Sequence, residues 1–267
     1  MARPLITFTS DFGLDDWFVG VVHGVIEQVC PDARVVDLTH TIPPGQIERA
    51  AFIVGAAAPD FPPGTVHLAV VDPGVGTERR ALAVRAHRQL FVGPDNGVLD
   101  WAFADREAEA HALTDARYFR APVSRTFHGR DVFAPVAAHL ARGVPLASVG
   151  PRVRDPMRLT ALVSHREDGA LAGRITFIDR FGNALTNLRA EEIALAFPRV
   201  PEADLEVRVA GRRLRGIRQA YGDNTVGTLV AIMSSSGVLE VAQVGGDVAD
   251  RLGIGVGDPV SVVIAAP

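Results

Sequence analysis

Short apolar runs of strand length alternate with stretches of helical apolar spacing over the first half of the chain. The strand-like runs are residues 5–10, 34–38, 65–72, 81–86 and 90–97. The stretches with helical spacing are residues 15–29, 46–61 and 129–143. Residues 65–72 are nearly continuous in apolar side chains, as in a strand covered on both faces. This alternation predicts an α/β domain with a largely parallel sheet.

The pattern changes after about residue 160. The later strand-like stretches, joined by glycine turns, are residues 171–179, 205–217, 228–244 and 259–266. Only two short helical stretches interrupt them, at 190–197 and 247–252. We therefore expect an N-terminal α/β domain, residues 1–163, and a smaller C-terminal β-rich, barrel-like domain, residues 164–267.

Composition excludes several classes of protein. The chain has 267 residues, 48% of them hydrophobic, and no apolar run approaches the roughly 20 residues that span a bilayer. The net charge of −4 argues against a general nucleic-acid binder. The N-terminal apolar stretch is too short for a secretory signal, so a cytoplasmic protein without membrane or nucleic-acid partners is expected.

Residue types that are rare or missing narrow the chemistry further. Cys30 is the only cysteine, so a disulfide within the chain and a thiolate zinc site are excluded. All 27 basic residues are arginine, which removes Schiff-base lysines and the P-loop lysine. The eight histidines show no metal-ligand spacing, and a metal site is not predicted.

Three polar clusters of the first half follow predicted strands or precede a helix. Asp11 follows the first strand and could bind ribose hydroxyls or cap the next helix. Asp72 ends an apolar strand, and a glycine-rich turn returns Arg79 towards it; such a pair can orient water or brace the turn. His128 lies in a loop before a helix, a better place for function than a core.

Two clusters of the second half suit a nucleoside and an amino acid. Residues 178–183 (IDRFGN) combine an acid, an aromatic face and an amide that could contact a purine. Residues 233–237 (MSSSG) offer hydroxyls and backbone N–H groups to a carboxylate. Each cluster could equally be an ordinary turn.

The motifs in order resemble one family. They are SDFG (10–13), VDPGVGTER (71–79), PDNGVL (94–99), FHGRD (127–131), IDRFGN (178–183) and SSSGVL (234–239). Together they resemble the S-adenosylmethionine hydroxide adenosyltransferases, the water-using relatives of fluorinases and chlorinases. The resemblance runs from about residue 5 to the C-terminus. It implies that S-adenosyl-L-methionine is the substrate and that no cofactor takes part.

The resemblance also assigns roles to residues. The catalytic residues that surround the attacking water would be Asp72, Arg79 and His128. The substrate-binding residues would be Asp11 for the ribose, Phe127, Asp179 for the methionine amino group, Phe181 and Asn183 for the adenine, and Ser235 near the methionine carboxylate. Halogenating relatives carry arginine where this chain has Ser236, so hydroxyls and backbone would bind that carboxylate here.

Departures from the halogenases indicate the nucleophile. Fluorinases have tyrosine at the positions of Asp72 and His128 and serine at Gly129. A carboxylate would repel a halide by roughly a few kcal/mol in a poorly solvated pocket, and would favour water. We therefore expect hydrolysis to adenosine and L-methionine by in-line attack on ribose C5′, with a halogenase or a non-catalytic adenosine-binding module as alternatives. Relatives form trimers or dimers of trimers, which implies a homotrimer with the site at the subunit interface.

Overall fold

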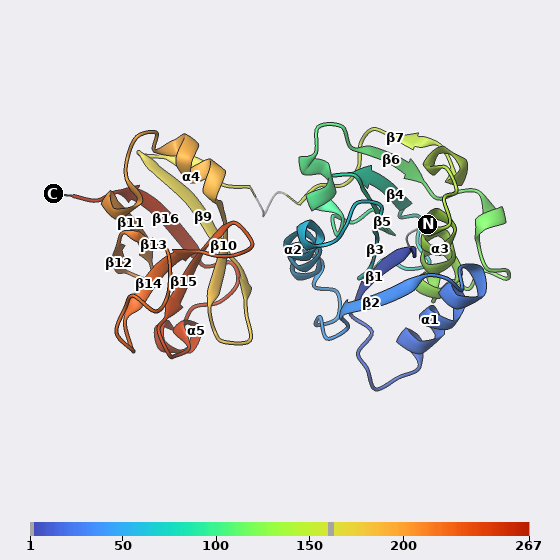
Figure 1. The fold of residues 1–267 in the computed structure, drawn as a ribbon, viewed down its shortest axis with the longest axis horizontal. Helices are drawn as coiled ribbons and strands as arrows, with labels where there is room; N and C mark the ends of the chain where they lie inside the picture. Colours follow the sequence, from blue (N-terminus) through green and yellow to red (C-terminus); the bar gives the residue numbers. More distant parts are fainter. Residues whose placement is uncertain (1–2, 160–162, 267) are drawn as a thin grey trace. The chain divides into compact units, whose positions relative to one another are not determined.

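The computed structural model describes residues 3–159 and 163–266. The chain divides into two compact units, Met1–Leu159 and Thr160–Pro267, hereafter unit 1 and unit 2. Each unit has its own sheet (Figure 1). Each also has its own hydrophobic core, so each is described by itself.

Unit 1 contains a seven-stranded sheet in the order β2-β1-β3-β5-β4-β6-β7. The strands are β1 (Leu5–Ser10), β2 (Arg34–Thr39), β3 (Val66–Val70), β4 (Ala81–Ala86), β5 (Gln89–Pro94), β6 (Glu109–Ala112) and β7 (Arg152–Val153). The first four strands in this order are mutually parallel, and the last three add antiparallel pairs. The largely parallel sheet expected from the sequence is confirmed.

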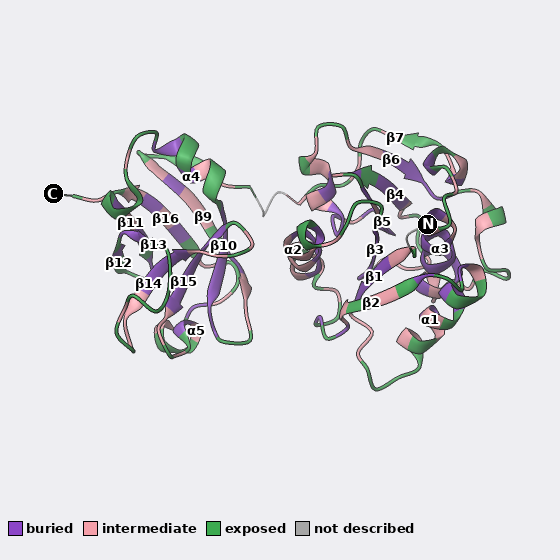
Figure 2. Cartoon of the chain, in the orientation of Figure 1, coloured by how far each residue is buried: buried purple, intermediate pink, exposed green. Residues whose placement is uncertain are grey.

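Helices cover both faces of the unit 1 sheet (Figure 1). They are α1 (Phe18–Val29), α2 (Ile47–Ala57) and α3 (Ala134–Ala141). Successive residues of β3 point to opposite faces, so Leu68 packs in the core under α1 and α3, and Ala69 packs in the core under α2. All of β3 is buried, as Figure 2 shows by colour, and this explains its continuous apolar sequence.

Unit 2 is built around a nine-stranded sheet. Eight of the strands follow the path β12-β11-β16-β9-β10-β15-β14-β13, and β8 pairs with β9 outside this path. Its strands are β8 (His165–Glu167), β9 (Ala170–Ile178), β10 (Ala184–Arg189), β11 (Leu205–Val209), β12 (Arg212–Arg215), β13 (Ile217–Arg218), β14 (Leu229–Met233), β15 (Val238–Gln243) and β16 (Pro259–Ile264). Contacts between the two ends of this path nearly close the sheet. Two short helices, α4 (Ala190–Ala196) and α5 (Val248–Leu252), complete the barrel-like unit.

Most predicted elements are present, with local differences. The strands expected at 5–10 and 81–86 are β1 and β4 with the same bounds. The helix expected from residue 15 begins at Phe18, and Leu14 and Trp17, which precede it, are both exposed. The helix expected from residue 129 opens with a π-helical turn, Gly129–Phe133, in which the Ala134 N–H bonds to the carbonyl five residues back. Strands β6, β7, β8 and β10 were not predicted.

Candidate active site

Two predicted site acids lie at the carboxyl-terminal edge of the unit 1 sheet. Strands β1 and β3 are parallel neighbours, with Ser10 opposite Val70. Asp11 follows β1 directly and Asp72 follows β3 by two residues, so both leave the sheet at one edge. The Asp11 carboxylate accepts a hydrogen bond from the Gly45 N–H at 2.9 Å. Ligands of open parallel sheets bind at this edge.

Arg79 holds the Asp72 carboxylate from the far end of the same turn. Its Nε donates to the two carboxylate oxygens at 2.9 and 3.0 Å, and its Nη2 also donates to Oδ2. The guanidinium lies over the Phe133 ring, 5.2 Å from the centroid. Only 12% of the Arg79 side chain and 6% of the Asp72 side chain are exposed. Solvent therefore screens little of the attraction, and the pair is a fixed charged element.

Arg79 also connects His128 to this pair. Its Nη2 lies 2.8 Å from His128 Nδ1. Because a guanidinium can only donate, Nδ1 is the acceptor, and the proton of the neutral imidazole is on Nε2. Burial first, and then the positive charge of Arg79, lowers the pKa of His128 below 6.5, so the ring is neutral at pH 7. The structure thus brings Asp72, Arg79 and His128 into one hydrogen-bonded chain.

The turn that carries Asp72 and Arg79 passes close to the loop that leads to His128. Gly76, in this turn, has a φ of +76°. A Cβ added at Gly76 would lie 2.2 Å from the carbonyl oxygen of Arg125. Glycine therefore satisfies both the backbone angle and the close approach of the two segments.

Phe127 belongs to an aromatic cluster beside His128. Its ring centroid lies 5.8 Å from that of Phe12 and 5.2 Å from that of Phe18. A Cβ added at Gly129 would lie 3.0 Å from the Phe12 ring, so little space is left on that side. Packing fixes Phe127 next to His128, and its contact with substrate stays a prediction.

Asp131 is a buried anchor to which sequence analysis gave no role. Its carboxylate accepts from Ser124 N–H at 2.8 Å and from Arg130 Nε at 2.7 Å, and Arg120 adds a longer contact at 3.3 Å. Burial by itself raises the pKa of Asp131, but the hydrogen bonds from Arg130 and Ser124 outweigh it, and the pKa is lowered. Asp131 thereby fastens the loop before His128 to the helical segment after it. The sequence signal for this anchoring role was an aspartate that follows an arginine at the start of a predicted helix.

In unit 2, the four predicted residues line one cavity of about 640 Å³. Asp179, Phe181 and Asn183 come from the turn between β9 and β10, and Ser235 comes from the turn between β14 and β15. The Phe181 side chain is 74% exposed, so its ring can stack on a planar ligand. The volume lies within the range of small-molecule sites.

The Asp179 carboxylate accepts hydrogen bonds from its own turn. Its Oδ1 accepts from the backbone N–H groups of Phe181 and Asn183 at 2.8 and 2.9 Å, and its Oδ2 accepts from Asn183 Nδ2 at 3.0 Å. In this arrangement one Asn183 amide donor is used inside the protein. Gly182, with φ of +80°, has no room for a Cβ, which would overlap the Asp247 carboxylate.

Among the residues that line the same cavity, three with polar side chains were missed: Tyr221, Glu240 and Gln243. Glu240 and Gln243 lie on β15, within a stretch that reads as an ordinary apolar strand. An acid inside that stretch was a visible signal for Glu240. Tyr221 lies between β13 and β14, and nothing in its local sequence points to the cavity.

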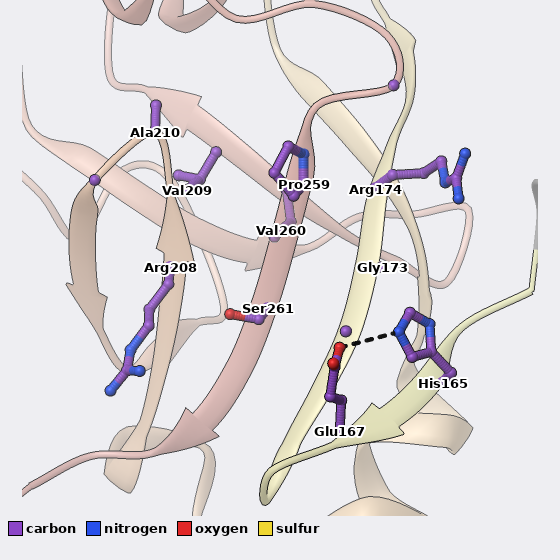
Figure 3. A pocket seen from close by; sticks show the side chains of 13 residues that line it. His165, Glu167, Gly173, Arg174, Arg208, Val209, Ala210, Pro259, Val260 and Ser261 are labelled. Atoms are coloured by element: carbon purple, nitrogen blue, oxygen red, sulfur yellow. Dashed lines mark ion pairs between the residues drawn. The ribbon is translucent and has the colours of Figure 1, made fainter.

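A second cavity of unit 2, of about 530 Å³, contains none of the predicted site residues. Figure 3 shows it between β8, β9, β11 and β16, with His165 and Glu167 paired at 3.5 Å. Both of these side chains are exposed, and Arg208 on the opposite side donates to Glu206. Exposed pairs of this kind contribute little energy and do not indicate a buried binding site.

In residues 3–159 and 163–266, no group of three or more histidine, cysteine, aspartate or glutamate residues is arranged to hold a metal ion. None of the helices in this described part of the chain combines the length and hydrophobicity needed to cross a bilayer.

Comparison with known proteins decides the family. The N-terminal domain of SAM hydroxide adenosyltransferases matches residues 6–150, and the C-terminal domain matches residues 173–261. The chain belongs to the SAM hydroxide adenosyltransferase family. The family expected from the ordered motifs is therefore confirmed.

Several relatives of the family align with nearly the whole chain. The (R)-S-adenosyl-L-methionine hydrolase of Salinispora arenicola is 44% identical, with 98% of each chain covered. That of Thermus thermophilus is 42% identical over 98% of this chain and 100% of its own. The crystal structure of a conserved Thermotoga maritima protein has a TM-score of 0.88 and 36% identity, covering 97% of this chain and 99% of that one. A fluorinase of Nocardia brasiliensis is more distant, at 31% identity over 72% of this chain and 73% of its own.

Proposed function

We propose that this protein hydrolyses S-adenosyl-L-methionine to adenosine and L-methionine. The observation that carries the proposal is the half-buried, hydrogen-bonded chain of Asp72, Arg79 and His128 at the carboxyl-terminal edge of the unit 1 sheet. The names of the relatives at 42–44% identity support the same reaction. The substrate already carries a reactive sulfonium, so the proposed reaction uses no cofactor.

The nucleophile is a water molecule or hydroxide bound next to the Asp72–Arg79–His128 chain. Because Arg79 occupies Nδ1 of His128, the free Nε2–H donates to the nucleophilic oxygen. Asp72 has lone pairs left beside Arg79 and accepts a proton of the water. Such polarisation contributes roughly 10²–10⁴-fold to the rate. Arg79 therefore serves both partners, since it fixes the carboxylate and sets the imidazole tautomer.

The bond changes need little further acid–base chemistry. The O–C5′ bond forms as the C5′–S bond breaks. The electron pair of the C5′–S bond stays on sulfur and neutralises the sulfonium. Methionine leaves as a thioether and needs no proton. In-line placement of the water is then the main demand, and positioning can contribute up to about 7–11 kcal/mol. Asp11, in the loop after β1, is proposed to hold the ribose hydroxyls.

Liquid chromatography of an incubation with S-adenosyl-L-methionine tests the proposal. We expect equimolar adenosine and methionine without added metal, and we expect Asp72→Ala to lower turnover by roughly 10²–10⁴-fold. Arg117→Ala, which changes an exposed pair of unit 1, is the control. Because the relatives are named for the (R) compound, the two sulfonium epimers are assayed separately. A 5′-halo-5′-deoxyadenosine product would indicate a halogenase, and adenosine binding without turnover would indicate a non-catalytic module.

We further propose that the protein is a homotrimer in which unit 1 of one protomer and unit 2 of a neighbour form each site. Support comes from the separation of the residues: Asp72, Arg79 and His128 lie in unit 1, whereas the exposed Phe181 ring lies in unit 2. Mixing Asp72→Ala protomers with Phe181→Ala protomers would then restore part of the activity. Additive residual activities after subunit exchange would contradict a shared site.

Two smaller proposals concern organisation and compartment. The boundary between the two domains is proposed at residues 163 and 164, close to the division between units 1 and 2. The protein is proposed to act in the cytoplasm, where a free thiol such as Cys30 stays reduced. Fractionation of cells that produce the protein tests the second proposal.

A further inference from the structure

Glu240 is a buried acid in the middle of a strand. It lies on β15, and only 4% of the residue is exposed. Its strand neighbours Leu239 and Val241 belong to the unit 2 core, so Glu240 points to the opposite face and lines the cavity of about 640 Å³. Burying a carboxylate costs several kcal/mol unless a partner compensates for the lost water. A carboxylate buried at this cost indicates a specific role for Glu240.

Among the described residues, Glu240 has a phenol as its partner and no cation. Tyr221 Oη donates a hydrogen bond to Glu240 Oε1. Within the described residues, no arginine or histidine pairs with this carboxylate. The residues opposite Glu240 on the neighbouring strands, Leu185 and Ile232, are uncharged. The carboxylate is therefore oriented without being neutralised.

A second acid adds to the excess of negative charge in the cavity. Asp179 lines the same cavity, and its hydrogen bonds go to its own turn. Burial, and the negative charge of Asp179, raise the pKa of Glu240 above 4.5, although the Tyr221 hydrogen bond opposes this. Burial also raises the pKa of Tyr221, so the phenol keeps its proton as the donor. The titratable groups facing Glu240 are thus Tyr221 and Asp179.

We infer that Glu240, oriented by Tyr221, binds the positively charged amino group of the methionine part of the substrate. An ammonium group has three donors and no acceptor, which suits a cavity with two carboxylates and no cation. The inference rests on the proposed function, and it adds Glu240 to Asp179, which the family resemblance assigned to this amino group. Tyr221 acts through Glu240 and is a positioning residue.

Calorimetric titration of the full chain tests this assignment. The probes are L-methionine and 4-(methylthio)butanoate, which lacks only the amino group, each in the presence of saturating adenosine. We expect the wild type to prefer methionine by roughly 10- to 100-fold, and Glu240→Gln to lose most of that preference, with Asp179 retaining the remainder. Glu206→Gln, an acid of unit 2 paired with Arg208, is the matched control and keeps the full preference.

The pH dependence separates a binding role from a structural one. Methionine affinity in the wild type falls as the pH decreases through the pKa of Glu240, because the protonated acid no longer attracts the ammonium. Glu240→Gln abolishes this dependence. Tyr221→Phe removes a hydrogen bond that lowers the pKa of Glu240, so the fall moves to higher pH. This second variant gives the answer even if Glu240→Gln does not fold.

Two results would overturn the inference. One is a folded Glu240→Gln variant that keeps the preference for methionine over 4-(methylthio)butanoate. The other is a methionine affinity whose pH dependence is the same in Tyr221→Phe and wild type. Neither result touches hydrolysis, which is read separately by chromatography. Conversely, a wild type that fails to hydrolyse S-adenosyl-L-methionine still reports on Glu240 through methionine binding.

Discussion

Arg79→Ala tests how strongly the catalytic chain is tied to the stability of unit 1. The change removes the cation from Asp72, of which only 6% of the side chain is exposed. Removing one partner of a buried pair costs about 3–5 kcal/mol, because the remaining charge is left without compensation. At about 2–4 °C per kcal/mol for a chain of this size, Tm should fall by roughly 6–20 °C.

Differential scanning calorimetry at pH 7 measures this loss. Arg117→Ala is the control, because Arg117 also contacts an aspartate but is 78% exposed, and its partner Asp115 is 23% exposed. Exposed pairs contribute about 0–1 kcal/mol, so the control should change Tm by only a few degrees. Equal, small losses in both variants would refute the view that the Asp72–Arg79 pair is shielded from solvent.

The same variant has a second readout at His128. The positive charge of Arg79 helps to lower the pKa of this histidine, and Asp72 raises it. In Arg79→Ala the pKa should therefore move upward, and part of the imidazole becomes charged at lower pH values where the wild-type ring stays neutral. NMR titration of the His128 ring protons follows this directly. An unchanged titration curve would mean that Arg79 does not set the state of the ring.

Three further predictions concern backbone fit, an anchor and the nucleophile. Gly76→Ala should lower the free energy of unfolding in urea by at least about 2 kcal/mol more than Gly13→Ala does. Both glycines have positive φ, but an added Cβ would lie 2.2 Å from a carbonyl oxygen at Gly76, whereas nothing lies within 4 Å of it at Gly13. Asp131→Asn should lower the free energy of unfolding by about 3 kcal/mol at pH 7. That difference should shrink as the pH falls below 3.8 through the lowered pKa of Asp131, because the wild-type carboxylate then protonates too; a pH-independent difference would count against an ionic role. Gly129→Ser should reduce turnover about tenfold or more, since an added Cβ would lie 3.0 Å from the Phe12 ring. Chromatography of an incubation of this variant in chloride should show no halogenated product, because the Asp72 carboxylate is still present.

Local hydrophobic pattern predicted much of the fold because strand and helix periods are local properties. Strands β1 and β4 agree with their predicted bounds for this reason. Strand β6, with the sequence EAHA, is short and carries charged and polar residues, and it is a strand because β4 and β7 lie beside it. Pairing between distant segments is not encoded in local periodicity, so such strands were missed.

The site was predictable to a different degree in its two parts. The ordered motifs singled out Asp72, Arg79 and His128, but each had an ordinary structural explanation, and only the folded chain shows that Arg79 contacts both others. Tyr221, between β13 and β14, meets Glu240 on β15 through a hydrogen bond that spans 19 residues of sequence. No short motif could report that meeting. The roles of all these residues stay predictions until the variants are measured.

The π-helical turn after His128 has a consequence for how this site can change. Helix α3 is fixed by its buried face, and His128 is fixed by Arg79, so the turn Gly129–Phe133 sets the rotational phase between them. Deleting one residue would restore α-helical winding and swing the imidazole by about 100° around the helix axis. Chemistry at this position is therefore controlled by chain length as well as by residue identity. One codon lost here would redirect the imidazole without replacing any catalytic residue, and it would also shift Val132 and Phe133, which belong to the hydrophobic core.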